Sequence, residues 1–295
     1  MVNWCAVIMA GGSGSRLEPL TRSVNKHLLP VYDKPMIYFP LTTLMLGGLR
    51  DFFIVTSPEH VPQFEALLGD GSHLGISITM RVQENPGGIA ECFRICQPDI
   101  GERNVALILG DNIFYGAGLT SLVQRGLARD RGATIYGYEV ADASSFGVVT
   151  LGDDGRAVSL IEKPTHPGSQ LAVPGLYFYD NRVATIAAQQ VRSGRGELEI
   201  TDINRAYLEL GELYVERIMR GIAWLDGGTP DDLFEAGQLV RVLEKRAAMR
   251  IACPEEVALR KGFVTSGQLR ATIATYPNGS YKAYLTGLLD TVDAA

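Results

Sequence analysis

A glycine-rich loop followed by two cations is the first part of the chain that could do chemistry. The loop follows six small or apolar residues, Cys5–Ala10, and precedes Arg16 and Lys26. Glycines let a backbone turn sharply and approach a ligand closely, and the N–H groups exposed in such a turn bind phosphate well. Arg16 adds a forked set of donors. The residues that we expect to form this phosphate loop are Gly11, Gly12, Ser13, Gly14 and Ser15.

Two common nucleotide loops do not fit this stretch. The dinucleotide fingerprint G-x-G-x-x-G needs a third glycine where Leu17 stands, which disfavours a dinucleotide-dependent oxidoreductase. The Walker loop needs a lysine directly after its last glycine, and none stands at that spacing. A tight strand-to-helix turn with two solvated bases remains the plain structural alternative.

Two aspartates each end a short apolar segment. Asp111 comes after Val105–Leu109, and Asp226 comes after Ala223–Leu225. Ligands of open α/β sheets collect at the carboxyl ends of the strands, and Mg²⁺ takes one or two carboxylates together with substrate phosphates. Each aspartate could equally be a turn residue, Asp111 as the cap of a following helix. Their presence in a chain with a phosphate loop favours a shared Mg²⁺ site.

The elements that must position these residues alternate between strands and helices. Short loops separate strand and helix patterns as far as Val105–Leu109, which is typical of a doubly wound α/β sheet. Further strands follow from Thr134, and a long helix is predicted from Pro230, capped by Thr229. We expect a nucleotide-binding α/β unit over residues 1–250 and a helical C-terminal extension over 251–295.

Composition bounds the possible functions. The chain has 295 residues, a net charge of −6 and 46% hydrophobic residues, which is ordinary for a globular protein and argues against a general nucleic-acid binder. No apolar run approaches the length needed to span a bilayer. The four cysteines show no spacing typical of a metal site. We expect a cytoplasmic protein that binds neither nucleic acid nor membranes.

The loop and the segment after it resemble a family signature. Gly11-Gly-Ser-Gly-Ser-Arg-Leu17 with Lys26-His-Leu-Leu-Pro30 is similar to G-G-x-G-[ST]-R-L…K-x-[LM]-[LV]-P of the sugar-nucleotide pyrophosphorylases, and the resemblance extends to about Gly262. It implies a Rossmann-like mixed sheet of the nucleotide-diphospho-sugar transferase type. It also implies Mg²⁺-dependent nucleotidyl transfer, with dTTP and glucose 1-phosphate as substrates and dTDP-glucose and pyrophosphate as products.

The resemblance implies a role for each matching residue. Arg16, Lys26 and Lys163 would act in catalysis, and Asp111 and Asp226 would hold the metal. Glu162-Lys163-Pro164 matches the family motif E-K-P. The nucleotide would contact the glycine loop together with Gln83 and Gly88. The sugar would contact Gly147, Glu162, Val173, Glu197 and Trp224.

Three positions depart from the pattern expected of the members that use dTTP. His27 replaces a glutamine, Gly87 replaces an acid, and Phe146 replaces a tyrosine. These changes keep the reaction but leave the nucleobase and the sugar open, so a pyrophosphorylase with another base or another sugar is the alternative. A non-catalytic regulatory protein that binds sugar nucleotides is the alternative of another class.

The C-terminal segment from Cys253 resembles the region after the catalytic core in tetrameric, feedback-inhibited members. The resemblance therefore implies a homotetramer, and Arg220 and Arg260 could contribute to a second phosphate site. The plainer interpretation is a surface helix with solvated bases.

Overall fold

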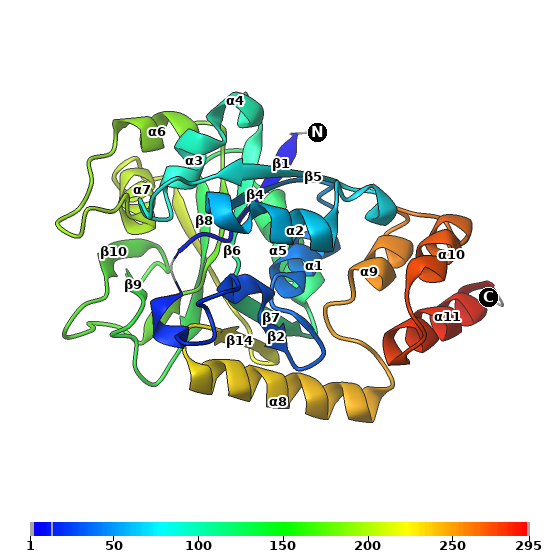
Figure 1. Ribbon diagram of the computed structural model, residues 1–295. Coiled ribbons are helices and arrows are strands. Elements are labelled where there is room, and N and C mark those ends of the chain that lie inside the picture. The colour runs from blue at the N-terminus through cyan, green and yellow to red at the C-terminus, as the bar shows by residue number, and fades with distance from the viewer. Residues whose placement is uncertain (1–2, 13, 294–295) are drawn as a thin grey trace.

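The computed structural model describes residues 3–12 and 14–293, and a ten-stranded sheet runs through the centre of this part of the chain (Figure 1). The strands are β1 (Trp4–Met9), β2 (Pro30–Val31), β3 (Lys34–Pro35), β4 (Asp51–Thr56), β5 (Ser77–Val82), β6 (Asn104–Leu109), β7 (Asn112–Gly116), β8 (Ala133–Glu139), β9 (Gly147–Leu151), β10 (Ala157–Glu162), β11 (Leu171–Val173), β12 (Leu176–Tyr179), β13 (Leu213–Arg217) and β14 (Ile222–Asp226). The α-helices are α1 (Tyr38–Gly47), α2 (Val61–Leu68), α3 (Glu91–Ile95), α4 (Gln97–Ile100), α5 (Leu119–Leu127), α6 (Val183–Gln189), α7 (Ile200–Glu209), α8 (Pro230–Ala247), α9 (Pro254–Arg260), α10 (Ser266–Thr275) and α11 (Ser280–Asp293).

Strand β1 is buried on both faces of the sheet. Ala6 and Ile8 belong to an apolar cluster with α1 and α5, whereas Cys5 and Val7 belong to another with α3, α6 and α7. Successive residues of a strand point to opposite faces, so a strand covered on both sides needs an uninterrupted apolar run. The prediction of a doubly wound sheet is confirmed.

The order of the strands makes the sheet mixed. It is β10-β9-β11-β8-β12-β6-β1-β4-β5, with β13 paired to β8. Strands β1, β4, β5 and β6 are parallel, and β12 runs antiparallel between β6 and β8. The glycine loop after β1 and Asp111 after β6 therefore lie at the same edge, where the carboxyl ends of the parallel strands meet.

The chain after Asp111 forms a strand rather than a helix. Strand β7 pairs antiparallel with β14, and Asn112 stands opposite Asp226 in this two-stranded sheet. The patterns in the sequence predicted neither β7 nor α5. This long-range pairing carries Asp226 to the edge where Asp111 lies.

Three helices follow the long helix α8. Helix α9 packs beside α1, and α10 and α11 pack together next to it (Figure 1). Helix α8 begins as predicted, because Thr229 Oγ1 accepts a hydrogen bond from Asp232 N at 3.2 Å and Pro230 is the first helical residue. Among the helices that are described, none combines the length and the apolar character needed to cross a membrane.

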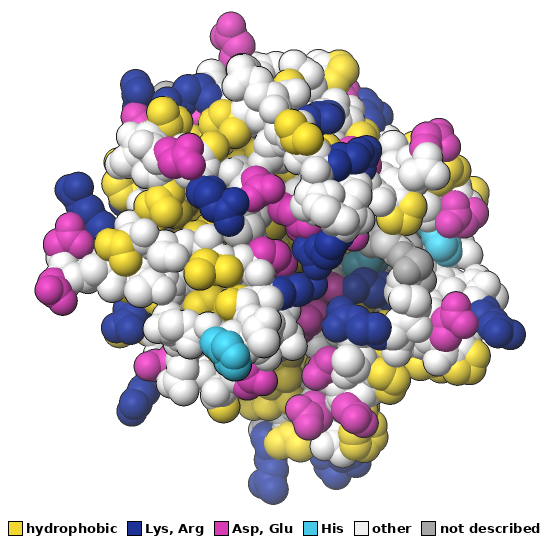
Figure 2. All heavy atoms as spheres, turned by 90° about the vertical axis from the view of Figure 1, so that its left-hand side faces the viewer, with side chains coloured by type: hydrophobic (Ala, Val, Ile, Leu, Met, Phe, Trp, Pro, Cys, Tyr) yellow, Lys and Arg dark blue, Asp and Glu magenta, His cyan; other side chains and the backbone are white. Residues whose placement is uncertain are grey.

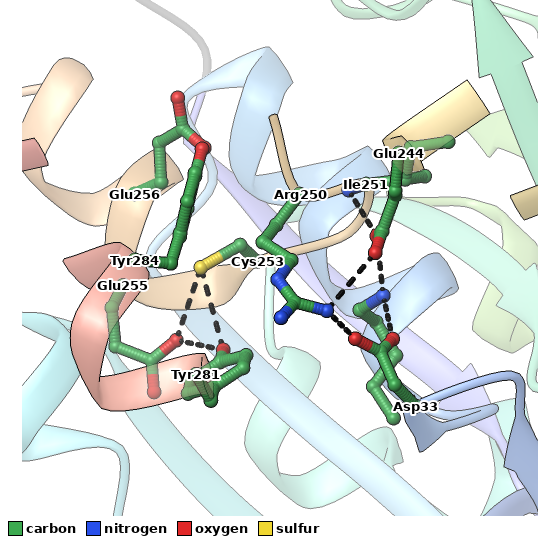
Figure 3. A network of polar contacts seen from close by, with 10 residues as sticks. Asp33, Glu244, Arg250, Ile251, Cys253, Glu255, Glu256, Tyr281 and Tyr284 are labelled. Atoms are coloured by element: carbon green, nitrogen blue, oxygen red, sulfur yellow. Dashed lines mark hydrogen bonds and ion pairs between the residues drawn. The ribbon is translucent and has the colours of Figure 1, made fainter. Parts of the chain in front are cut away.

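A buried network of charges joins the end of α8 to the turn between β2 and β3 (Figure 3). Lys34 Nζ donates to Glu244 Oε1 at 2.6 Å and to Asp33 Oδ1 at 2.5 Å. Arg250 forms ion pairs with Asp33 and with Glu244, and Ile251 N donates to Glu244 Oε1 at 2.7 Å. Only 2% of Lys34 and 8% of Glu244 are exposed. Buried charges need partners of this kind, so the network ties α8 to the core.

Candidate active site

Two of the three predicted catalytic residues, Arg16 and Lys163, line a cleft of about 570 Å³ beside the carboxyl end of β6, and Lys26 contacts its lining residue Asp111. Figure 2 shows this side of the molecule, on which Lys and Arg side chains gather near the middle, beside Asp and Glu, around a hollow. The predicted site residues in the lining of the cleft are Arg16, Asp111, Gly147, Glu162, Lys163, Val173, Trp224 and Asp226.

The glycine loop has the backbone that its sequence indicates. Gly14 is left-handed, with φ 61°, at the start of the short helix Ser15–Leu17, and a Cβ there would lie 2.9 Å from Thr21 Cγ2. Gly12 has φ 100°. These conformations favour glycine. Ser13, also predicted to contact the nucleotide, lies outside the described residues.

Arg16 and Asp226 both approach Gly228. A Cβ on Gly228 would lie 2.8 Å from Arg16 Nη2 and 3.2 Å from Asp226 Oδ2. Glycine at this position therefore lets a cation and a carboxylate approach one wall of the cleft together.

Lys26 and Asp111 form an ion pair, and Asp111 lines the cleft. Lys26 Nζ contacts Asp111 Oδ2, and each side chain is 13% exposed. Asn112 Nδ2 donates to Asp111 Oδ1 at 3.0 Å, and Gly227 N donates to Asp111 O at 2.9 Å. These bonds fix the Asp111 carboxylate relative to the end of β14.

The pKa values of the two aspartates shift in opposite directions. Burial opposes the charge of Asp111, but the charge of Lys26 and the hydrogen bonds from Lys26 and Asn112 act together against it and hold the pKa of Asp111 below its usual range. Burial, and then the charge of Asp111, raise the pKa of Asp226 to about 6. A divalent cation between them would favour the charged form of both.

The donor set fits Mg²⁺. No group of three or more His, Cys, Asp and Glu side chains gathers as a metal site in the described parts of the chain. Asp111 and Asp226 thus offer a pair of carboxylates, and Mg²⁺ typically takes one or two carboxylates and completes its shell with substrate phosphates and water.

The hairpin β9–β10 and strand β11 also contribute to the lining of the cleft. Gly147 stands opposite Glu162 in the hairpin and opposite Val173 in β11. Lys163 follows in a left-handed conformation, with φ 42°, and its N–H donates to Phe146 O at 3.0 Å. Register thus brings together residues that are far apart in the chain.

Trp224, in β14, also lines the cleft. Its Nε1 donates to Asn112 Oδ1 at 2.7 Å, and its ring packs edge-on against Phe146, with ring centroids 5.0 Å apart. Phe146, one of the three departures, therefore supports the ring of Trp224 through apolar contact.

Gln83 and Gly88 lie beside the glycine loop. Gln83 Nε2 donates to Gly88 O at 3.2 Å. A Cβ on Gly11 would lie 2.6 Å from Gln83 Oε1. The predicted nucleotide-binding residues Gly11, Gln83 and Gly88 are therefore adjacent, although Gln83 and the loop are far apart in sequence.

Several predicted residues are not among those that line the cleft, including Lys26, Gln83, Gly88 and Glu197. The Glu197 side chain is 43% exposed, and its Oε2 lies 3.9 Å from Arg195 Nη2. His27, one of the three departures from the pattern of members that use dTTP, is 1% exposed. Its Nδ1 lies 2.7 Å from Asn25 Oδ1, and its ring packs on Gly110. Burial and the charge of Lys26 lower the pKa of His27 to about 3.

Sequence reasoning missed two residues next to Glu162. Thr201 Oγ1 donates to Glu162 Oε2, and Arg195 Nη2 lies 3.8 Å from Glu162 Oε1. Arg195 stands two residues before Glu197, and a cation so close to a predicted sugar contact was the available signal.

A larger cavity of about 890 Å³ lies away from this chemistry, between α1, β7, the end of α8 and the C-terminal helices. Of the two arginines considered for a second phosphate site, Arg260 lines this cavity, and its Nε donates to Glu256 Oε1 at 2.6 Å.

A doubly wound sheet with a glycine-rich loop and two aspartates at its strand ends suits an enzyme that acts on phosphates. The chain belongs to the nucleotidyl transferase family, whose model matches residues 5–241. The resemblance noted in the sequence, and the class of enzyme that it implies, are confirmed.

Three proteins similar to this chain are named for one activity, glucose-1-phosphate thymidylyltransferase. The chain is 50% identical to a glucose-1-phosphate thymidylyltransferase of Mycobacterium tuberculosis (strain CDC 1551 / Oshkosh), over 96% of this chain and 98% of that one. It is 50% identical to one of Neisseria meningitidis, with the same coverage. A Bacillus anthracis protein assigned to this activity and solved with sucrose superposes with a TM-score of 0.75 at 39% identity, over 81% of this chain and 95% of that one.

Proposed function

We propose that the chain transfers a thymidylyl group from dTTP to glucose 1-phosphate, which yields dTDP-glucose and pyrophosphate. Relatives that share half of the sequence over nearly its whole length are named for this activity. The observation that carries the proposal is the cleft itself, whose lining brings together the cations Arg16 and Lys163 and the carboxylates Asp111 and Asp226.

The residues of the cleft suit an in-line displacement. A phosphate oxygen of the sugar 1-phosphate attacks the α-phosphorus of dTTP, a new P–O bond forms, and the bond to pyrophosphate breaks. Lys163 holds the attacking phosphate, while Arg16 and Lys26 neutralise the triphosphate and the departing pyrophosphate. Such catalysis rests on positioning and charge neutralisation, without a covalent intermediate.

Asp111 and Asp226 would hold Mg²⁺, which would supply positive charge to the phosphate oxygens. Until it binds, Lys26 balances Asp111, while burial and the charge of Asp111 disfavour the charged form of Asp226 and raise its pKa to about 6. Glu162, held by Thr201, accepts hydrogen bonds from sugar hydroxyls. Gln83, beside the glycine loop, contacts the nucleobase.

The test is pyrophosphate release by Arg16→Ala. Loss of one group that neutralises developing charge should lower kcat by about 100-fold or more. Arg22→Ala is the matched control, because the Arg22 side chain is 75% exposed and its contact with Glu18 spans 3.8 Å; its turnover should match that of the unaltered enzyme. Near-normal turnover in Arg16→Ala would contradict the proposal, and a panel of triphosphates and sugar 1-phosphates would identify another base or sugar.

A further inference from the structure

A carboxylate takes no part in the reaction described above, although it lies beside the loop Gln83–Gly88. We call this loop the base-reading loop, because Gln83 is proposed to contact the nucleobase. Glu91, the first residue of α3, accepts a hydrogen bond from Gln83 Nε2 through Oε2 at 2.8 Å and one from Arg192 Nη2 through Oε1 at 2.7 Å. The Glu91 side chain is 19% exposed. It covers Gly87 so closely that a Cβ on Gly87 would clash with both carboxylate oxygens.

These contacts decide which way the Gln83 amide faces. Its Nε2 lies near two acceptors, Gly88 O at 3.2 Å and Glu91 Oε2 at 2.8 Å. An amide nitrogen has two N–H donors, whereas the amide oxygen only accepts. Both N–H donors are therefore used. If the amide were turned over, its oxygen would face the oxygens of Gly88 and Glu91, which repel it.

The remaining atom of the amide faces the nucleotide loop. Gln83 Oε1 lies over Gly11, and it accepts no hydrogen bond from the residues that the structure describes. Because both Nε2 donors are used, Oε1 is the polar atom of the buried Gln83 side chain that is left to bind a ligand.

The loop around this amide is also held in place. Arg192 Nη1 donates to Gly87 O at 3.2 Å and to Gly196 O at 2.9 Å, and Leu198 N donates to Gly87 O at 2.8 Å. Arg192 thereby links Glu91 and the base-reading loop to the segment before α7. A carboxylate that is itself fixed can hold the Gln83 amide in one orientation.

We propose that Glu91 is a positioning residue that sets nucleobase specificity: it holds the Gln83 NH₂ group, so that Oε1 alone meets the base and selects a ring N–H donor. The inference rests on the proposed function, in which Gln83 contacts the base. Thymine and uracil carry such a donor at N3. Cytosine carries a lone pair at N3, which would face the lone pairs of Oε1, and repulsion of this kind is an effective source of specificity.

The experiment compares kcat/KM for dTTP with kcat/KM for dCTP. In Glu91→Ala the Gln83 amide can turn over, and the dTTP preference should fall about tenfold, as expected for one lost hydrogen bond together with relieved repulsion. The loss for dTTP should appear in KM rather than in kcat. Glu91→Gln keeps an acceptor for Nε2 and should keep most of the preference. Glu84→Ala removes an exposed carboxylate from the same loop and serves as the matched control.

Arg192→Met tests the inference at a second residue, should Glu91→Ala fail to fold. It removes the donor that holds Glu91 Oε1, so the Glu91 carboxylate can turn away from Gln83 and the dTTP preference should fall in the same direction as in Glu91→Ala. An unchanged preference in folded Glu91→Ala, or in folded Arg192→Met if Glu91→Ala does not fold, would overturn the role of Glu91 while unaltered enzyme still forms dTDP-glucose. Absence of dTDP-glucose with the unaltered enzyme would instead overturn the proposed function.

Discussion

Replacing Lys26 by methionine should destabilise the metal-free protein, because the buried Asp111 would lose its cation. Removal of one partner of a buried ion pair costs about 3 to 5 kcal/mol. Each side chain of this pair is 13% exposed, so water would screen part of the charge. Asp226 lies close by and adds repulsion. We therefore expect the free energy of unfolding to fall by about 3 kcal/mol at pH 8.

The sign of the pH dependence follows from the charge of Asp111. In the unaltered protein its pKa is lowered, so it contributes stability above its unfolded pKa and loses that contribution as the pH falls. Without Lys26, burial would raise the same pKa, and the charged form would destabilise the fold at high pH. The difference between the variant and the unaltered protein should therefore be largest at pH 8 and shrink toward pH 5.

Urea unfolding followed by circular dichroism, with a chelator present, measures this difference. The double variant Lys26→Met/Asp111→Asn removes both charges and should recover most of the lost stability, because no unpaired charge remains at Asp111. Equal stabilities of Lys26→Met and the unaltered protein at pH 8, or a double variant no more stable than Lys26→Met, would refute this reasoning.

Four further measurements bear on the site and the fold. Burial and Asp111 raise the pKa of Asp226 to about 6, so Mg²⁺ or Mn²⁺ affinity measured by calorimetry should fall as the pH drops below that value, and equal affinities at pH 5 and pH 8 would count against a metal role for Asp226. Asp180 accepts hydrogen bonds from Gly132 N and Tyr207 Oη, both at 2.7 Å; burial opposes its charge, but Arg182 and Gly132 hold its pKa below the usual range. Asp180→Asn should therefore lower the free energy of unfolding at pH 7 by about 3 kcal/mol and by progressively less as the pH falls through the acid range, and a penalty that does not change with pH would exclude the charge as its cause. His27→Gln should alter kcat without changing the ratio of kcat/KM for dTTP and UTP, because His27 packs under the Lys26 segment; a changed ratio would place it at the base. Light scattering should give the mass of a homotetramer at micromolar concentration, and a monomer would contradict that expectation.

The sequence predicted the functional residues that directly follow a recognisable strand. The apolar run before Asp111 identified a strand buried on both faces, and such a strand ends where ligands bind. The strands predicted after Thr134 include the one that ends at Glu162, directly before Lys163. In both cases the evidence lies within a few residues of the functional side chain.

Pairing between distant segments could not be predicted in the same way. Asp226 reaches Asp111 through the β7–β14 ladder, and a short strand says nothing about its partner. His27 stands beside Lys26 in sequence, yet its ring turns into the core because Gly110 leaves room for it. Arg195 approaches Glu162 because a loop folds back from α7, which neither residue indicates by itself.

The charge network around Lys34 decides where the chain can be shortened. The match to the family ends at residue 241, but Glu244 and Arg250 lie beyond it and belong to the network that surrounds Lys34. A fragment ending at residue 241 would keep Lys34 in the core with Asp33 alone. Because Ile251 N also donates to Glu244 Oε1, the smallest fragment that keeps these charges compensated extends at least through Ile251. A protein expressed only to residue 241 would therefore contain a buried charge that has lost most of its partners. If that fragment were insoluble, the result would not measure the stability of the catalytic unit.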